Sequence, residues 1–236
     1  MRASCPIRHM PPSLCGRVDL AAAAGFYLPA MTDQKSRSLT GVLLLASLVA
    51  MVAAAAIVVP SGLTLNPADP AAALAAVRER TGLHLTELAL DVLGWLGLTA
   101  AGLAMAVRRA VMAGGLLAAA GLAGLLHDAG NLAVTQLAAD PAAVTVASAV
   151  LLTAKWMVNL AGLLWVAATV AAAAGVPGRL RTAGLVAALS GLVAVALPWT
   201  TGTDGPTAAM EQLGYALHLP IMVWYGILGR RFLRSS

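Results

Sequence analysis

Long apolar stretches recur along the whole chain, with short polar segments between them. They cover about residues 40–60, 83–107, 110–137, 143–174, 180–199 and 208–229. A transmembrane helix needs ~20 mostly apolar residues, and each stretch reaches about that length. The stretches are rich in Ala and Leu and lack the strict alternation typical of barrel strands. The pattern therefore predicts an all-α fold, a polytopic transmembrane helical bundle of about six spans.

Composition agrees with a location in the membrane. The chain is 60% hydrophobic and 11% charged, whereas soluble domains are roughly 45–50% apolar and about 25% charged. The net charge of +5 does not indicate nucleic-acid binding, because the basic residues are spread between the apolar stretches instead of forming one patch.

The positions of Lys and Arg predict the orientation, because basic residues gather on the cytoplasmic side of membrane proteins. One side would hold Arg2, Arg8, Arg17, Lys35, Arg37, Arg108, Arg109, Arg179, Arg181, Arg230, Arg231 and Arg234. The other side would hold Arg78 and Arg80, together with Asp69, Glu79, Asp140 and Asp204. This alternation predicts a multi-pass protein of the cell membrane with both termini cytoplasmic.

The segment 1–38 is expected to be a cytoplasmic leader that is disordered, or the product of a start site assigned too early, with Met31 as the true start. Its basic residues followed by an apolar run resemble a secretory signal peptide. Asp19 interrupts that run, however. Cys5 and Cys15 fit no zinc spacing. The six-helix domain is then expected at 39–234.

The segments on the outer side begin in a similar way. Asp69-Pro70, Asp140-Pro141 and Asp204-Gly205-Pro206 each place an acidic residue shortly before a proline. Asp is a favoured N-cap and Pro suits the first helical position. The first of these pairs predicts a short outer-face helix at 70–80, which serves either as a lid or as a plain connector.

Glycines in the second and third spans predict close helix packing, since small residues allow two helices to approach. They are Gly94, Gly97 and Gly102, and Gly114, Gly115, Gly121 and Gly124. The first and fifth spans contain no internal charge and are expected to face lipid.

Ionisable residues inside spans are costly, so they usually face the bundle interior and serve a function. Here they form stripes at helical spacing: His84, Glu87 and Asp91 with Trp95; His127, Asp128 and Asn131; Lys155 and Asn159; Glu211, Tyr215 and His218. Several of them lie about 8–12 residues from the outer end of their span, on the order of 12–18 Å deep at ~1.5 Å per residue. A polar pocket in the outer half of the membrane, above an apolar floor, is the prediction.

These residues divide into two sets of candidates. Acid–base roles are assigned to Asp91, Asp128, Glu87, His127 and His218. Ligand-binding roles are assigned to His84, Asn131, Lys155, Asn159, Glu211 and Tyr215. No metal site is predicted, and the sequence leaves any cofactor open.

Other interpretations of the same residues stay open. Lys155 forms a buried ion pair with Asp91 or Asp128, or else a Schiff base. His127 and His218 ligate a haem, or they bind a non-haem metal together with His84 and Glu87. A simpler interpretation than haem or metal binding is that His127 and His218 form a hydrogen-bonded pair.

The segment Leu90–Arg109, LDVLGWLGLTAAGLAMAVRR, resembles the acidic second span and double-Arg ending of small bacterial multi-pass membrane proteins of unassigned function. In size and in its few intramembrane carboxylates, the chain is also loosely similar to small membrane-bound terpene cyclases. That resemblance implies a carboxylate that protonates an isoprenoid.

Three functions follow as hypotheses. The first is a sensing, binding or accessory protein whose pocket accepts a small or lipid-like ligand. The second is an intramembrane acid–base enzyme acting on an isoprenoid or lipid, and the third is a small transporter. The expected partners are membrane lipids and an apolar small molecule, and the oligomeric state is not specified.

Overall fold

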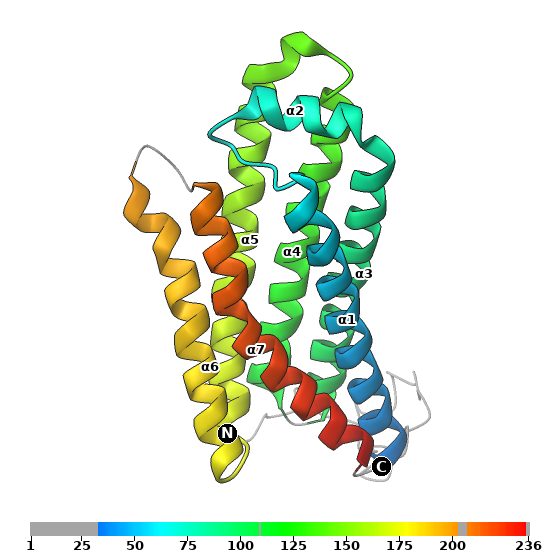
Figure 1. The fold of residues 1–236 in the computed structure, drawn as a ribbon. Coiled ribbons are helices and arrows are strands. Elements are labelled where there is room, and N and C mark those ends of the chain that lie inside the picture. The colour runs from blue at the N-terminus through cyan, green and yellow to red at the C-terminus, as the bar shows by residue number, and fades with distance from the viewer. Residues whose placement is uncertain (1–32, 109, 203–206, 235–236) are drawn as a thin grey trace, which may run out of the picture. The chain divides into compact units, whose positions relative to one another are not determined.

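The computed structural model describes residues 33–108, 110–202 and 207–234, and every regular element in these ranges is a helix. Long helices run alternately in opposite directions (Figure 1). The elements are α1 (Asp33–Ser61), α2 (Pro70–Glu79), α3 (Thr81–Val107), α4 (Val111–Leu137), η3 (Pro141–Ala143), α5 (Val144–Ala174), α6 (Arg179–Ala196), η4 (Leu197–Thr201) and α7 (Ala208–Arg234). The predicted all-α fold is confirmed for this part of the chain.

The predicted leader falls mostly outside the described residues. Residues 33–38, which were expected to belong to it, instead form the start of α1. Within the described ranges, five helices are long and apolar enough to cross a membrane: α1 from Gln34, α3, α4, α5, and α6 together with η4. The sixth expected span, α7, has 27 residues but is not among these five.

The connections define two ends of the bundle (Figure 1). The α2 end carries α2 and the α4–α5 connection. The opposite end, called the basic end, carries the start of α1, the α3–α4 and α5–α6 connections and the end of α7. Described basic residues at the basic end are Lys35, Arg37, Arg108, Arg179, Arg181, Arg230, Arg231 and Arg234, whereas those at the α2 end are Arg78 and Arg80.

Two of the predicted N-caps at the α2 end are confirmed. The Asp69 carboxylate accepts a hydrogen bond of 3.0 Å from Ala72 N at the start of α2. Asp140 does the same for Ala142 N at 2.8 Å, at the start of η3. These bonds satisfy backbone donors that have no partner within the first helical turn. The third capping segment, 204–206, lies outside the described residues.

Helix α2 closes the α2 end of the bundle by packing on α4 and α5. Leu74 and Val77 are buried against Val134 and Leu151. Arg78 Nε donates a hydrogen bond of 2.7 Å to Ala138 O at the end of α4, and Arg80 donates to Ser61 O at the end of α1. Such packing is compatible with a lid and with a plain connector, so both interpretations of this helix stay open.

The α3–α4 interface depends on glycine, as predicted. A methyl group on Gly102 would overlap the backbone of Ala118, and one on Gly114 would overlap the backbone of Ala106. The two helix backbones are therefore in direct contact at these positions. Gly115 differs from the other predicted packing glycines, since no atom lies within 4 Å of an added methyl group there.

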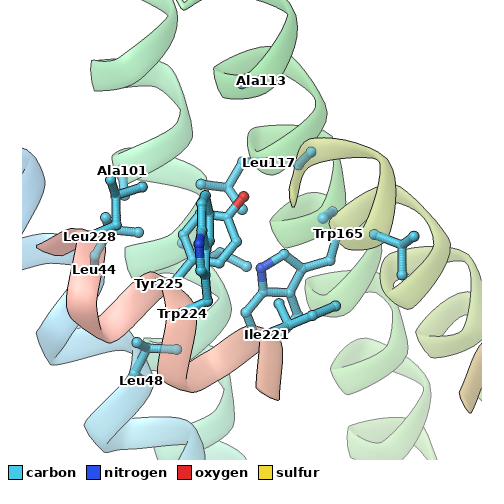
Figure 2. Packing of buried hydrophobic residues seen from close by; sticks show 14 of the residues in the cluster. Leu44, Leu48, Ala101, Ala113, Leu117, Trp165, Ile221, Trp224, Tyr225 and Leu228 are labelled. Atoms are coloured by element: carbon cyan, nitrogen blue, oxygen red, sulfur yellow. The ribbon is translucent and has the colours of Figure 1, made fainter. Parts of the chain in front are cut away.

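Helices α1 and α7 meet near the basic end and diverge toward the α2 end (Figure 1). A Cβ atom on Gly229 of α7 would lie 3.3 Å from Gly41 O of α1. Below the point of divergence, a hydrophobic core fills the space between the helices (Figure 2). Fully buried Leu44, Ile221 and Tyr225 belong to it. The divergence leaves room for a cavity between the α2-end halves of the two helices.

Candidate functional site

A cavity of about 290 Å³ occupies this space. Its apolar wall comes largely from α1, including Met51, Val52 and Val58, and from Leu219 and Met222 of α7. Its polar wall consists of Glu87, Asp91, His127, Lys155, Asn159, Glu211, Tyr215 and His218. Helix α1 was expected to face lipid, but one of its faces forms a wall of the site. A helix without charges can still line a cavity, and the sequence pattern could not distinguish the two cases.

The cavity opens sideways, through the gap between α1 and α7. Val52, Tyr215 and Leu219 line it and are 50%, 44% and 51% exposed. These residues lie within the long helices instead of at their ends. Helix α2 packs on α4 and α5 at the α2 end, whereas these exposed lining residues belong to α1 and α7.

The α3 stripe points into the bundle as its spacing predicted. His84 Nδ1 lies 3.3 Å from Glu87 Oε2, and His84 is 1% exposed. Trp95 Nε1 donates a hydrogen bond of 3.2 Å to Asp91 Oδ2. That bond fixes the Asp91 carboxylate at the junction between the polar wall and the aromatic floor.

Asp128 of α4 lies behind Asp91. It is 2% exposed, and neither of its carboxylate oxygens receives a hydrogen bond from a described residue. Ligand atoms of Asp91, His127 and Asp128 all lie within 4.8 Å of one another. The structure thus brings together two predicted acid–base carboxylates from different helices, of which Asp128 is buried and Asp91 is half-buried.

Both ring nitrogens of His127 are engaged. Nδ1 lies 2.8 Å from Ala154 O; because a carbonyl only accepts, Nδ1 carries the hydrogen. Nε2 lies 3.0 Å from the side-chain amide of Asn131. Gly130 allows α5 to approach closely here, since an added methyl group would lie 2.9 Å from Ala154 Cβ. His127 has no free nitrogen for a haem or a metal unless Asn131 moves.

The partner of Lys155 differs from the expectation. Its ammonium lies 2.7 Å from Glu211 Oε1 on α7, and both side chains are largely buried. The predicted pairing with Asp91 or Asp128 is wrong. Glu211 lies in the first turn of α7, and its approach to α5 depends on how α7 folds back along the bundle.

His218 is the histidine with a nitrogen open to the cavity. Its Nδ1 lies 3.0 Å from Gly214 O, one turn earlier on α7, and therefore donates to it. No described residue forms a hydrogen bond with Nε2. Gly162 of α5 makes space for the ring, because an added methyl group would lie 3.0 Å from this nitrogen. In this tautomer Nε2 presents a basic lone pair to the cavity.

Asn159, a predicted ligand-binding residue, is occupied by structural bonds. Its Nδ2 donates to Val195 O of α6 at 2.9 Å, and its Oδ1 accepts from Trp199 Nε1 of η4 at 2.9 Å. Asn159 lines the cavity, but its amide joins α5 to α6 and η4.

A second, smaller chamber of about 40 Å³ lies toward the α2 end. His84 and Asn131 line it, and Glu87, Asp91, His127, Lys155 and Tyr215 line both chambers. Leu63 and Leu65, from the segment between α1 and α2, also line it. Every predicted site residue except Asp128 therefore lines at least one of the two spaces.

The floor of the cavity is aromatic. Trp95 and Trp165 line it, with ring centroids 6.0 Å apart at 69°. Trp165 in turn lies 6.1 Å from Tyr225, which packs against Trp224 at 5.0 Å (Figure 2). These contacts continue the aromatic cluster toward the basic end. Sequence analysis did not identify Trp165 or Trp156 as site residues, because a tryptophan in an apolar run is as common in plain packing.

Comparison of the chain with protein-family models, with characterised proteins and with solved structures finds no match. The resemblance to small terpene cyclases therefore stays a prediction. Function has to be argued from the chemistry of the cavity.

Proposed function

We propose that the chain is a six-span protein of the cell membrane with both termini in the cytoplasm. Five apolar helices support membrane insertion. The basic end carries most of the described Lys and Arg residues, as cytoplasmic ends do. In this arrangement α7 is the sixth span. Its polar residues, Glu211 and His218, face the cavity, so they do not prevent α7 from crossing a bilayer.

Its function in this proposal is to bind a lipid-like or other apolar small molecule that enters from the bilayer. The observation that carries this is the sideways opening of a cavity with one apolar and one polar wall. An apolar body would contact Val52 and Leu219, while a polar group would reach Asp91 or Glu211. Sites of this kind combine mainly apolar contacts with a few polar groups that orient the ligand.

Native mass spectrometry of the detergent-purified protein tests the binding function. The unmodified chain is expected to retain a lipid-like molecule. Ala55→Trp fills the cavity, because Ala55 lines it, and should abolish retention. Ala56→Trp is the matched control, because Ala56 is exposed on the same helix and does not line the cavity. Equal retention in both variants would place the bound molecule elsewhere.

An intramembrane acid–base enzyme is the second candidate, supported by the open Nε2 of His218 and the Asp91–Asp128 pair. One carboxyl of the pair would donate a proton to a double bond of an isoprenoid-type substrate. His218 Nε2 would then remove a proton from the resulting carbocation, so the net reaction is an isomerisation or cyclisation. Trp95 and Trp165 would stabilise the positive charge through their ring faces.

Incubation with polyprenyl hydrocarbons in D₂O tests this second candidate. Turnover would introduce deuterium into the product, measured by mass spectrometry. Asp91→Asn and His218→Gln should each abolish incorporation, because they remove the donor and the acceptor. Glu79→Gln, at an exposed carboxylate on α2, should retain it. Incorporation that survives in His218→Gln would exclude this residue as the base.

A further inference from the structure

Carboxylates outnumber cations around the cavity. Glu87, Asp91 and Glu211 line it, with Asp128 directly behind Asp91. Lys155 is the one Lys or Arg among the described lining residues. A surplus of negative charge in a mostly apolar surrounding is costly unless a cation or protons balance it.

Ion pairing within the site leaves the excess negative charge at Asp91 and Asp128. Lys155 neutralises Glu211, and Glu87 has His84 Nδ1 as its neighbour at 3.3 Å. Asp91 and Asp128 have each other as neighbours, and a single proton shared between them still leaves one negative charge. His127 carries its hydrogen toward a carbonyl and has Nε2 bonded to Asn131, which fits the neutral ring. His218 has no acceptor at Nε2 that would stabilise a charged ring.

Aromatic rings line the same cavity as this charge. Trp95, Trp156, Trp165 and Tyr215 all line the cavity, and Trp95 is hydrogen-bonded to Asp91 itself. The faces of such rings attract cations, most strongly where water is excluded. An acidic group in a cavity lined by several aromatic rings favours a positively charged organic group over a neutral or anionic one.

We infer, on the basis of the proposed binding function, that the ligand is an organic cation: an apolar body carrying one ammonium-type charge. The charge lies at Asp91, against Trp95 and Trp156, and the apolar body lies along α1 toward the opening between α1 and α7. A hydrated metal ion gains nothing from contact with the apolar wall, and both ring nitrogens of His127 already form hydrogen bonds. The cavity therefore selects by charge as well as by hydrophobicity.

Binding of a matched pair of probes tests this inference. The charged probe is phenylpropyltrimethylammonium, and the neutral probe is its carbon analogue with tert-butyl in place of trimethylammonium. Saturable changes in tryptophan fluorescence of the full chain in detergent report binding, because three tryptophans line the cavity. The charged probe should bind at least tenfold more tightly than the neutral one.

Variants assign the preference to the site. Asp91→Asn retains an acceptor for Trp95 and should remove the preference for the charged probe. Trp156→Leu should reduce it several-fold. Glu79→Gln, which removes the same unit charge from an exposed position outside the cavity, should leave it unchanged. Thermal melts show whether each variant is folded, and the comparison of the two probes on the unmodified chain does not depend on any variant.

Other results separate the two proposals. Equal binding of both probes would overturn the inference and leave the proposed binding function in place. Binding of neither probe would count against both. Stoichiometric binding of Zn²⁺ that excludes the charged probe would replace the organic cation by a metal at Asp91, His127 and Asp128.

Discussion

The ammonium of Lys155 lies 2.7 Å from the carboxylate of Glu211 and joins α5 to α7 across the wall of the cavity. Both groups are largely buried, so each depends on the other for neutralisation. The pair also fixes the start of α7, which forms one side of the opening. Stability and access to the site are therefore connected through a single contact.

Loss of either partner should be costly. Lys155→Met leaves Glu211 as an uncompensated buried charge and should lower the free energy of unfolding by about 3 kcal/mol. Glu211→Gln should have a similar effect, whereas the double variant should recover most of the loss, since no charge is then left unpaired. Apparent melting temperatures in detergent measure all three. Additive losses in the double variant would contradict a direct interaction.

Asp128→Asn should stabilise the protein instead. It removes a buried carboxylate next to that of Asp91, and the new amide can donate a hydrogen bond to Asp91, worth about 1 kcal/mol. The expected result is a rise in apparent melting temperature. Destabilisation would mean that the Asp128 carboxylate holds a cation in the purified protein.

The floor of the cavity depends on the space beside Gly124. A methyl group there would overlap the ring of Trp95, so Gly124→Ala should lower the free energy of unfolding by about 1–3 kcal/mol. It should also displace the Trp95 N–H group that donates a hydrogen bond to Asp91. Gly115→Ala, on the same helix with no atom within 4 Å, is the control and should be neutral or slightly stabilising. Thermal melts and tryptophan fluorescence distinguish the two variants.

The histidines should differ in reactivity. Diethyl pyrocarbonate modifies unprotonated ring nitrogens that are free and accessible. His218 Nε2 meets both conditions, whereas both nitrogens of His127 are hydrogen-bonded. We expect His218 to react several-fold faster, as measured by peptide mass spectrometry. Equal rates would show that Asn131 does not protect His127.

Labelling in intact cells tests the proposed orientation. In a chain with Cys5 and Cys15 replaced by Ser, a membrane-impermeant maleimide should label Ala68→Cys, which is exposed at the α2 end. Pro177→Cys, exposed at the basic end, should react only after permeabilisation. The reverse pattern would invert the orientation, and labelling of both in intact cells would contradict an alternation of ends.

Much of the fold follows from local patterns that act within one helix. Apolar length predicted α3, α4 and α5 to within about two residues at each end. The Asp69 and Asp140 caps were predictable because capping involves residues two or three positions apart. That the polar residues of α3 face the bundle interior was predictable from their helical spacing and from the free-energy cost of placing ionisable groups in lipid.

Contacts between helices were not predictable in the same way. Lys155 was assigned to Asp91 or Asp128 because depth was the only available criterion, and Glu211 satisfies that criterion less well. The sequence of α1 does not show that one of its faces lines a cavity, since lipid-facing and cavity-facing positions are both apolar. The tautomers of His127 and His218 depend on backbone carbonyls that only the structure brings near.

Helix α7 is synthesised after the other described helices. The opening lies between α1 and α7, which meet at Gly41 and Gly229. In the proposed membrane topology, Lys155 is inserted before its partner Glu211 has been made, so α5 enters without the carboxylate that it pairs with in the folded chain. Asp91 and Asp128 are already present at that stage. A chain that stops before α7 would lack one side of the opening and would leave Lys155 without the carboxylate that neutralises it.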